Sequence, residues 1–567
     1  AELAGLAEVH AGKVVLPLDS YAKGDLGNDV SAACVGYLAA SMALEPSVNL
    51  VAVTDRVHLL NYRARSIQQT GTASDDLAAS PYTEKGLRGA GQIVQVSDTG
   101  CDIHSCYFTS ADGAAPFSEL RRSTFDLSYR KVVMYAVGGC GNEEDVYEGH
   151  GTHVSNTAVG SIEGADIADA GKYDGVAPDA KLAFADLSRS GGLCIPNSNQ
   201  LYNSGYNAGA RVASNSWGSS YSGGGYYDSQ GDDAYLYTRK DSLILFAAGN
   251  EGQEGDSSLT KQASGKNTVA IGSSESTLGG PNPNWVAYYS SKGPTFDGRI
   301  KPDVVAPGDS LTSAKSNGVG GPSCMTTTMS GTSMATPAVA GASLLIRNYF
   351  SSTSNDFWAG HCDTSYQWCG AFTPSGVMTK ALLLHSGTGM QMYHGGGTRD
   401  VMLGDAPDFM QGYGRVTLKN ILPLQGQNSF DLFVIEQNTK AMNSRVFTVT
   451  VKDSSGPLKV TLSWYDPPST GGTTTKTLLH DLDLKVQSPA GDIYYGNGGN
   501  SADRVNNNEQ VVAEDPLKGD WKVYVNSKAL PMDNRQQFAL IITSLGTVQG
   551  WGPGTADDLP TIFNPPL

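Results

Sequence analysis

Short β-branched and apolar runs alternate with helical patterns and with Gly/Asn-rich loops between Gly91 and Ile346. The runs Ile93–Val96 and Leu243–Ala248 have the length of buried strands. Strands that alternate with helices need crossover connections, which build a mostly parallel sheet flanked by helices. The predicted fold class of this region is therefore α/β.

Beyond about residue 425 the pattern changes to short strands separated by Gly, Pro, Asn and Asp. The predicted strands are Arg445–Val451, Leu458–Trp464, Leu482–Gln487, Trp521–Asn526 and Phe538–Thr543. Short strands with frequent turn residues are typical of an antiparallel β-sandwich or jelly roll. We therefore predict a separate β domain here.

The N-terminal part forms a third pattern. Residues 12–60 are predicted to form a strand, a helix and a strand, a small α+β unit followed by the polar stretch 68–80. The predicted organisation is residues 1–80 as an N-terminal extension, 81–425 as the α/β domain, 426–549 as the β domain and 550–567 as a tail.

Charge and hydropathy argue against two classes of partner. The 567 residues include 39 Lys and Arg against 56 Asp and Glu, a net charge of −17. Such a chain repels phosphate backbones, so no nucleic-acid partner is expected. No run of about 18 apolar residues occurs, so no membrane span is expected. Because Ala1 is not an initiator Met and no leader follows, a trimmed chain or a fragment is expected.

The chain has eight cysteines, and this even count favours disulfides and an oxidising compartment. No cysteine pair has the C-x-x-C spacing of a zinc site. The short loops Cys101–Cys106 and Cys362–Cys369 are the expected pairings, and reduced, buried thiols are the alternative.

Asp98 directly follows the run Gln95-Val96-Ser97 and precedes Thr99-Gly100. Its carboxylate is therefore expected at the carboxyl end of a buried strand, where α/β sheets place their sites. A structural turn is the alternative for this triplet. An aspartic protease would need a second D-T-G or D-S-G, and none occurs.

The segment Gly149–Val154 contains two histidines and opens a helical pattern. His150 is the candidate general base, whereas His153 is expected to be a packed structural residue. A zinc site at the pair is disfavoured, because the spacing is i, i+3 and no glutamate lies between them.

Ser333 and Asn250 are candidates for acyl-transfer chemistry. Ser333 lies just before the small-residue helix Ala338–Ile346, at a helix start where backbone N–H groups converge. Asn250 follows the strand 243–248 and could donate its NH₂ to an oxyanion. An N-cap role for Ser333 and a turn role for Asn250 are the alternatives.

The strand Arg211–Ala213 continues into Ser216-Trp217-Gly218, which could pair with an extended peptide by strand addition. Trp217 is alternatively a core or rim aromatic. Together, the candidates supply the four parts that acyl transfer needs, namely Asp98 as orienting carboxylate, His150 as base, Asn250 as oxyanion donor and Ser333 as nucleophile. A metal hydrolase at the histidine pair and a non-catalytic scaffold whose β domain binds protein or carbohydrate remain as alternatives.

The chain resembles a subtilisin-like serine protease, a subtilase, over roughly residues 85–425. The resemblance rests on Val96–Gly100, Gly149–Val154, Ala247–Gly252, Ser290–Pro294, Lys301–Gly308 and Gly331–Pro337. The order Asp, His, Ser along the chain is also that of subtilisin. This resemblance implies a serine endopeptidase in which Asp98 orients His150, His150 is base and then acid, Ser333 is the nucleophile and Asn250 lines the oxyanion hole.

The same resemblance implies a substrate-binding cleft. Ser216, Trp217 and Gly218 would align the substrate, and Ala247, Ala248 and Gly249 would form one wall of the specificity pocket. The implied partners are protein and peptide substrates, with no cofactor for catalysis. The implied location is extracellular or vacuolar-lysosomal.

Residues 411–416, followed by the strand-rich module, resemble the alkaline subtilases that carry a C-terminal β-barrel. This resemblance implies structural calcium, with Asp483, Asn497 and Asp503 as candidate ligands, and oxygen ligands of this kind suit Ca²⁺. Solvated, outward-facing carboxylates are the alternative.

Residues 12–60 resemble the later part of a subtilase propeptide, with maturation cleavage expected near Leu59–Tyr62. The resemblance implies a zymogen, or a complex in which the propeptide inhibits its own enzyme. A permanent N-terminal extension is the alternative.

Overall fold

The computed structural model describes most of the chain between residues 60 and 549. The described residues are 8–10, 13–15, 60–74, 80–110, 124–137, 145, 149–163, 172–189, 192–219, 229–276, 282–318, 323–353, 357–358, 370–396, 399–424, 430–469 and 476–549. The chain divides into two compact units, Ala1–His58 and Leu59–Leu567. In the first unit, β1 (Glu8–His10) and β2 (Lys13–Val15) form an antiparallel hairpin. The rest of the predicted α+β unit up to residue 59 and the tail at 550–567 lie outside the described residues.

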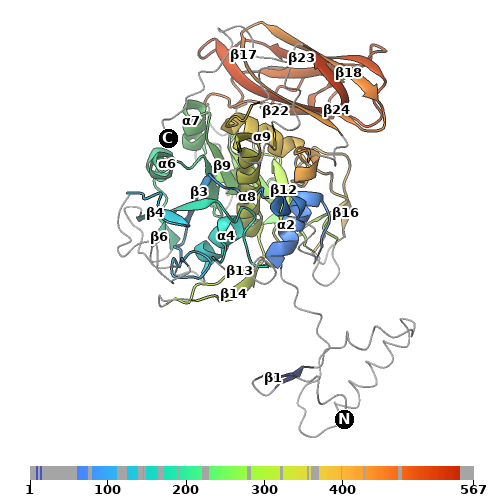
Figure 1. The fold of residues 1–567 in the computed structure, drawn as a ribbon. Coiled ribbons are helices and arrows are strands. Elements are labelled where there is room, and N and C mark those ends of the chain that lie inside the picture. Colours follow the sequence, from blue (N-terminus) through green and yellow to red (C-terminus); the bar gives the residue numbers. More distant parts are fainter. Residues whose placement is uncertain are drawn as a thin grey trace, which may run out of the picture. The chain divides into compact units, whose positions relative to one another are not determined.

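The second unit contains the predicted, mostly parallel sheet (Figure 1). Its order is β16-β15-β11-β10-β9-β8-β3-β5-β4, with β12 paired to β10. All neighbours from β4 through β10 to β12 are parallel, whereas β11 and β16 run antiparallel to β10 and β15. The strands are β3 (Ile93–Asp98), β4 (Val132–Val137), β5 (Lys181–Asp186), β8 (Val212–Asn215), β9 (Leu243–Ala247), β10 (Val269–Ser274), β11 (Trp285–Val286), β12 (Val304–Pro307), β15 (Met392–Tyr393) and β16 (Val401–Met402). Strands β9 and β10 are buried along their whole length, as expected for a sheet covered on both faces.

Helices pack on this sheet and on one another. They are α2 (Leu60–Thr70), α3 (Pro81–Glu84), α4 (His150–Val159), α6 (Ser198–Asn207), α7 (Gln230–Thr238), α8 (Thr332–Ser351) and α9 (Gly376–His385), with the short helices η5 (Gly252–Glu254), η6 (Gln262–Ser264) and η7 (Leu418–Asn420). A further short helix, η8 (Gly496–Gly498), belongs to the C-terminal strands and packs against β20 and β22. Helix α8 packs against α4 and against the central strands β8, β9, β10 and β12. Two small hairpins complete the domain, β6 (Ser188–Arg189) with β7 (Gly192–Leu193) and β13 (Leu311–Ala314) with β14 (Thr326–Met329). Across the described part of the chain, no helix is both long and apolar enough to cross a membrane.

Helix α2 lies within residues 1–80, the predicted N-terminal extension, yet it belongs to the second unit. Ala64 and Ile67 are buried, and the helix packs against α8, β12 and β13. Its buried face also carries polar side chains, Ser66, Gln68 and Gln69. Because these interrupt the apolar periodicity, the sequence pattern does not predict the helix.

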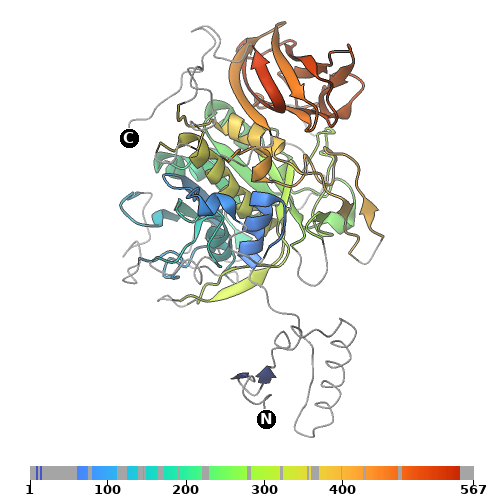
Figure 2. The same ribbon diagram turned by 45° about the vertical axis from the view of Figure 1, so that its right-hand side comes forward.

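The C-terminal strands form a separate antiparallel domain, as predicted (Figure 1). The strands are β17 (Asp431–Lys440), β18 (Ser444–Asp453), β19 (Leu458–Ser463), β20 (Leu482–Gln487), β21 (Ile493–Tyr495), β22 (Asn508–Ala513), β23 (Gly519–Ser527) and β24 (Arg535–Gln549). The first part of β24 pairs with β17 and β19, and its last residues pair with β18. The long strand therefore joins both parts of a sheet that wraps around its own apolar core (Figure 2).

Strands β17, β21 and β22 are absent from the sequence prediction. Strand β17 buries Gln437 and Thr439, and β22 begins with the buried polar residues Asn508, Glu509 and Gln510. Since alternation of apolar and polar residues is the signal for a half-buried strand, buried polar side chains remove that signal. Strand β21 has only three residues.

One predicted disulfide is wrong. Cys106 pairs with Cys324, 218 residues away, whereas Cys101 is a buried free thiol. The backbone explains the pairing, because the N–H of Cys106 donates to the carbonyl of Ser323 at 2.8 Å and places the two Cα atoms 5.2 Å apart. Cys194 is also disulfide-bonded. The predicted Cys362–Cys369 pair lies outside the described residues.

Candidate active site

Asp98 is the last residue of β3, at the carboxyl end of the central sheet as predicted. Its side chain is 1% exposed, and its Oδ1 lies 2.7 Å from His150 Nδ1. The same Oδ1 accepts a hydrogen bond from the N–H of Thr99 at 2.8 Å. A buried carboxylate in contact with Nδ1 holds the imidazole in one tautomer and leaves Nε2 for chemistry.

His150 is the first residue of α4, and glycines allow that helix end to reach β3. A Cβ on Gly151 would stand only 1.9 Å from the carbonyl oxygen of Gly100. Gly149, the N-cap, has a φ of 79°, which favours glycine. The G-H-G sequence therefore brings the His150 ring to Asp98.

Burial and charge act in opposite directions on His150. Burial disfavours the charged ring, but the charge and hydrogen bond of Asp98, together with the charge of Asp145, raise the pKa of His150 above its ordinary value of 6.5. The imidazole is thereby suited to accept a proton during a reaction.

His153 has a different environment, one turn further along α4. It is fully buried, and its Nε2 contacts the carbonyl of Leu311 at 3.1 Å. Burial lowers the pKa of His153 to about 3. Across the described residues, no group of three or more His, Cys, Asp or Glu side chains could hold a metal ion, so the metal-hydrolase alternative lacks a third ligand of this kind beside the two histidines.

Ser333 is the second residue of α8, half-buried, and its Oγ donates to the carbonyl of Ser216 at 3.0 Å. The Oγ of Ser216 in turn donates to the carbonyl of Ser333 at 2.8 Å. That carbonyl is available because Pro337, four residues later, has no N–H to make the helical bond. In this structure the hydroxyl of Ser333 is thus paired with Ser216, the first residue after β8, and not with His150.

Asn250 faces the start of α8. Its Oδ1 accepts from the N–H of Thr332 at 2.9 Å and from the Thr332 hydroxyl at 3.0 Å. Because that N–H can only donate, the facing atom is the oxygen, and Nδ2 is turned away from Thr332. A Cβ on Gly331 would lie 3.4 Å from Asn250 Nδ2, 3.5 Å from Asn250 Oδ1 and 3.6 Å from the backbone N of Ser333. The Asn250 amide and the N–H of Ser333 thus lie close to each other beside Gly331.

The predicted substrate segment follows β8. Trp217 Nε1 donates to the carbonyl of Ser97 at 2.9 Å, and its ring packs edge-on against Phe246 with centroids 5.3 Å apart. The indole therefore anchors this segment between β3 and β9, while Gly218 is exposed. A Cβ on Gly218 would lie 2.5 Å from the Thr260 side chain, so the segment requires glycine there.

Ala247 is the last residue of β9, Ala248 and Gly249 follow it, and all three are buried. Thr260 closes this wall, because its N–H donates to the carbonyl of Ala248 at 2.8 Å and its hydroxyl to that of Ala247 at 3.1 Å. Thr260 also lies against Gly218 and so links the predicted substrate-aligning segment to the predicted pocket wall. No sequence signal identifies it, since the register of the loop from Thr260 to Lys266 depends on tertiary packing.

The calcium expectation is not supported. Arg504 forms ion pairs with Asp483 and, at 3.2 Å, with Asp481. Asn497 Nδ2 donates to Asp503 at 2.7 Å. Across the described part of the chain, no group of three or more His, Cys, Asp or Glu side chains could hold a metal ion. These residues do not fit Ca²⁺, because the Arg504 guanidinium neutralises Asp483, and the Asn497 amide presents its NH₂ group rather than its oxygen to Asp503.

We therefore expect chelation to leave the stability of the protein unchanged. Thermal unfolding measured with EDTA and with millimolar Ca²⁺ should give the same Tm. A bound ion present at a concentration about 100-fold above its Kd would raise the free energy of unfolding by about 2.7 kcal/mol, and the resulting rise in Tm is readily measured. A reproducible rise in Tm with Ca²⁺ would contradict this expectation.

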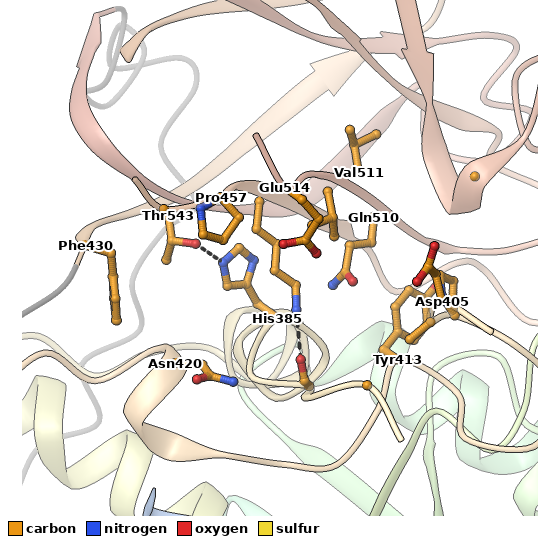
Figure 3. A pocket seen from close by; sticks show the side chains of 18 of the residues that line it. His385, Asp405, Tyr413, Asn420, Phe430, Pro457, Gln510, Val511, Glu514 and Thr543 are labelled. Atoms are coloured by element: carbon orange, nitrogen blue, oxygen red, sulfur yellow. Dashed lines mark hydrogen bonds between the residues drawn. The ribbon is translucent and has the colours of Figure 1, made fainter. Parts of the chain in front are cut away.

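A cavity of about 1410 Å³ lies between α9 and the β domain (Figure 3). None of the candidate catalytic residues lines it. His385 contacts Thr461 and Thr543 at 2.8 and 2.9 Å, and Lys459 Nζ donates to the carbonyl of Gly387 at 3.0 Å. Because these polar groups already have hydrogen-bond partners within the protein, we assign no function to the cavity.

Comparison with known proteins complements this geometry. The sequence profile of the subtilase family matches residues 89–414. The Dictyostelium discoideum "Serine protease/ABC transporter B family protein tagD" is 30% identical, with 76% of this chain and 29% of that protein covered. "Serine protease AprX" of Bacillus subtilis (strain 168) is 27% identical, with 51% and 64% covered. A solved serine protease of Aeromonas sobria is 15% identical with a TM-score of 0.40, and 86% of this chain and 94% of that one are covered. This chain therefore spans less than a third of the tagD protein.

Proposed function

The chain belongs to the subtilase family, and we propose that it is a serine endopeptidase that hydrolyses peptide bonds through an acyl-enzyme. The observation that carries the proposal is the 2.7 Å contact between Asp98 Oδ1 and His150 Nδ1 at the carboxyl end of the sheet. It supplies an oriented base with a raised pKa. Helix α8, which packs on the helix of that base, presents a half-buried serine hydroxyl at its first turn.

In the proposed reaction, Ser333 Oγ attacks the substrate carbonyl while His150 Nε2 takes the hydroxyl proton. Asp98 holds the tautomer and stabilises the imidazolium. The oxyanion is placed between the backbone N–H of Ser333 and Asn250 Nδ2. His150 then returns the proton to the leaving amine, and water repeats the sequence on the ester, releasing the acid and restoring Ser333.

Substrate binding is proposed to prepare the nucleophile. The carbonyl of Ser216 accepts the Ser333 hydroxyl in this structure, yet it lies at the segment where an extended substrate would add as a strand. A substrate backbone N–H bonded to that carbonyl would displace the hydroxyl, which could then turn to His150. The pairing of Ser216 with Ser333 would thus be exchanged for productive contacts when a peptide binds.

The proposal is tested by labelling the full chain with a fluorophosphonate probe and mapping the modified residue by mass spectrometry. The expected result is a single modification at Ser333, because only an activated hydroxyl beside oxyanion donors reacts. The exposed Ser330, three residues earlier, is an internal control and should remain unmodified. A folded wild type that never labels would overturn the proposal and favour a scaffold role.

We further propose an oxidising, extracytoplasmic location, supported by the Cys106–Cys324 disulfide. We also propose that the N-terminal extension predicted for residues 1–80 contains a propeptide that is removed near Leu59–Tyr62. The boundary between the two compact units at His58 and Leu59 supports a cleavage point there. Protein and peptide substrates are the proposed partners.

A further inference from the structure

Asp145 is a half-buried carboxylate that joins the two segments carrying Asp98 and His150. Its Oδ2 accepts from the N–H of Thr152 at 3.0 Å and from the Thr152 hydroxyl at 2.5 Å. Its Oδ1 accepts from the hydroxyl of Thr99 at 3.0 Å. Thr99 follows Asp98 on the strand side, and Thr152 lies two residues after His150 on the helix side.

Thr99 extends this connection to both reacting partners. Its hydroxyl oxygen accepts from the N–H of Gly151 at 3.0 Å, next to His150. Its own N–H donates to Asp98 Oδ1, the same atom that contacts His150 Nδ1. The network of Asp145, Thr99 and Thr152 thus bonds directly to Asp98 on one side and, on the other, to the backbone of the two residues that follow His150.

Helix α4 has a specific need for such a group. Its N-cap is Gly149, which makes no side-chain capping bond. The N–H groups of Gly151 and Thr152 belong to the first turn, where no backbone carbonyl is available within the helix. Asp145 accepts from the N–H of Thr152 directly, and it holds the Thr99 hydroxyl that accepts from the N–H of Gly151. Its negative charge at the N-terminus of the helix is also favourable.

We propose that Asp145 is a positioning residue for the catalytic pair, capping α4 from outside the helix and clamping it to the end of β3. This inference rests on the proposed function, since it assigns the residue to the same reaction. Without the carboxylate, the first turn of α4 would lose its caps, and the His150 ring would lose its fixed angle to Asp98. Because catalysis depends on geometry at the level of about 1 Å, such a loss lowers the rate without removing any reacting group.

The charge of Asp145 also acts on the base. Burial raises the pKa of Asp145 to about 6, so the carboxylate is ionised above that pH. Its charge contributes to the raised pKa of His150. The other titratable groups that interact with Asp145 are Asp98 on β3, Cys101 after that strand and Tyr135 on β4, and burial keeps both Cys101 and Tyr135 neutral. Removing the negative charge therefore lowers the pKa of His150.

The test compares wild type and Asp145→Asn by the pH dependence of kcat/KM on a peptide substrate. The expected result is a kcat about 10- to 100-fold lower with KM nearly unchanged. The acid limb of the profile should also move to lower pH, since His150 loses its proton more readily. Replacing a carboxylate with a purely structural role would leave the acid limb of the profile unchanged.

Asp174→Asn is the matched control, because burial also raises the pKa of Asp174, while its ion pair is with Arg88. This control should leave the acid limb in place. Thr99→Val is a second variant that removes the clamp and keeps Asp145. It should lower kcat as well, and the double variant should lose little more than Asp145→Asn alone.

An unmoved acid limb with unchanged kcat in Asp145→Asn would overturn the inference, as would fully additive losses in the double variant. If Asp145→Asn does not fold, the kcat of Thr99→Val tests the inference instead. A wild-type kcat in that variant would overturn it. A wild type without fluorophosphonate labelling would instead overturn the proposed function, so the two failures are distinguishable.

Discussion

Ser333→Ala is expected to lower kcat by about 10⁶-fold, the magnitude found when the nucleophile of subtilisin is removed. The variant keeps the base and the oxyanion donors but has no hydroxyl to form the acyl-enzyme. Stability should change little, because the half-buried hydroxyl makes one hydrogen bond, to Ser216, worth about 1 kcal/mol. The measurements are kcat and KM on a peptide substrate, together with thermal unfolding.

The matched control is Ser330→Ala, a serine of the same loop that accepts from the N–H of Ser310 at 2.7 Å. That variant should retain labelling at Ser333.

If the enzyme itself removes the N-terminal extension, the Ser333→Ala protein should retain the extension, and N-terminal sequencing would show this. Wild-type turnover in Ser333→Ala would contradict the assignment of the nucleophile.

Asn250→Ala is expected to lower kcat by about 10²- to 10³-fold, or about 3–4 kcal/mol, with little change in KM. This is the cost known for removing the corresponding oxyanion donor in subtilisin. The donor acts only when charge develops on the carbonyl oxygen, so the ground-state complex should bind as before. Steady-state kinetics on one peptide substrate separates the two parameters.

Asn250→Asp distinguishes oxyanion binding from a structural role. Asn250 Oδ1 holds the first turn of α8 through its two bonds with Thr332. The aspartate keeps this acceptor and loses the Nδ2 donor. A loss in kcat as large as that of the alanine variant is expected for an oxyanion donor. An aspartate variant with near wild-type kcat would show that Asn250 only positions α8.

The positions of the candidate residues at strand and helix ends could be predicted. Strand β3 ends at Asp98, α4 begins at His150, and α8 begins one residue before Ser333. These boundaries are set by local signals, namely apolar runs, glycines and a small-residue helix. The expectation that His153 packs structurally also agrees with its burial.

Elements with buried polar residues could not be predicted. Helix α2 and strand β22 bury polar side chains whose partners lie in other elements, for example Gln69, which accepts from the N–H of Tyr82, and Gln510, which donates to the Thr461 hydroxyl. Such residues are indistinguishable from solvated ones in a single sequence, because only the partner makes their burial favourable.

The amino-acid sequence alone determined the α/β class, the separate β domain and the family, because periodicity, turn chemistry and motif spacing are local properties of the chain. Tertiary structure alone decided that Cys106 pairs with Cys324, that Arg504 forms an ion pair with the candidate calcium ligand Asp483, and that Asp145 accepts a hydrogen bond from Thr99, the residue after Asp98. Each of these depends on which side chains a close-packed interior brings within a few ångströms, and residues far apart in a sequence carry no record of that distance.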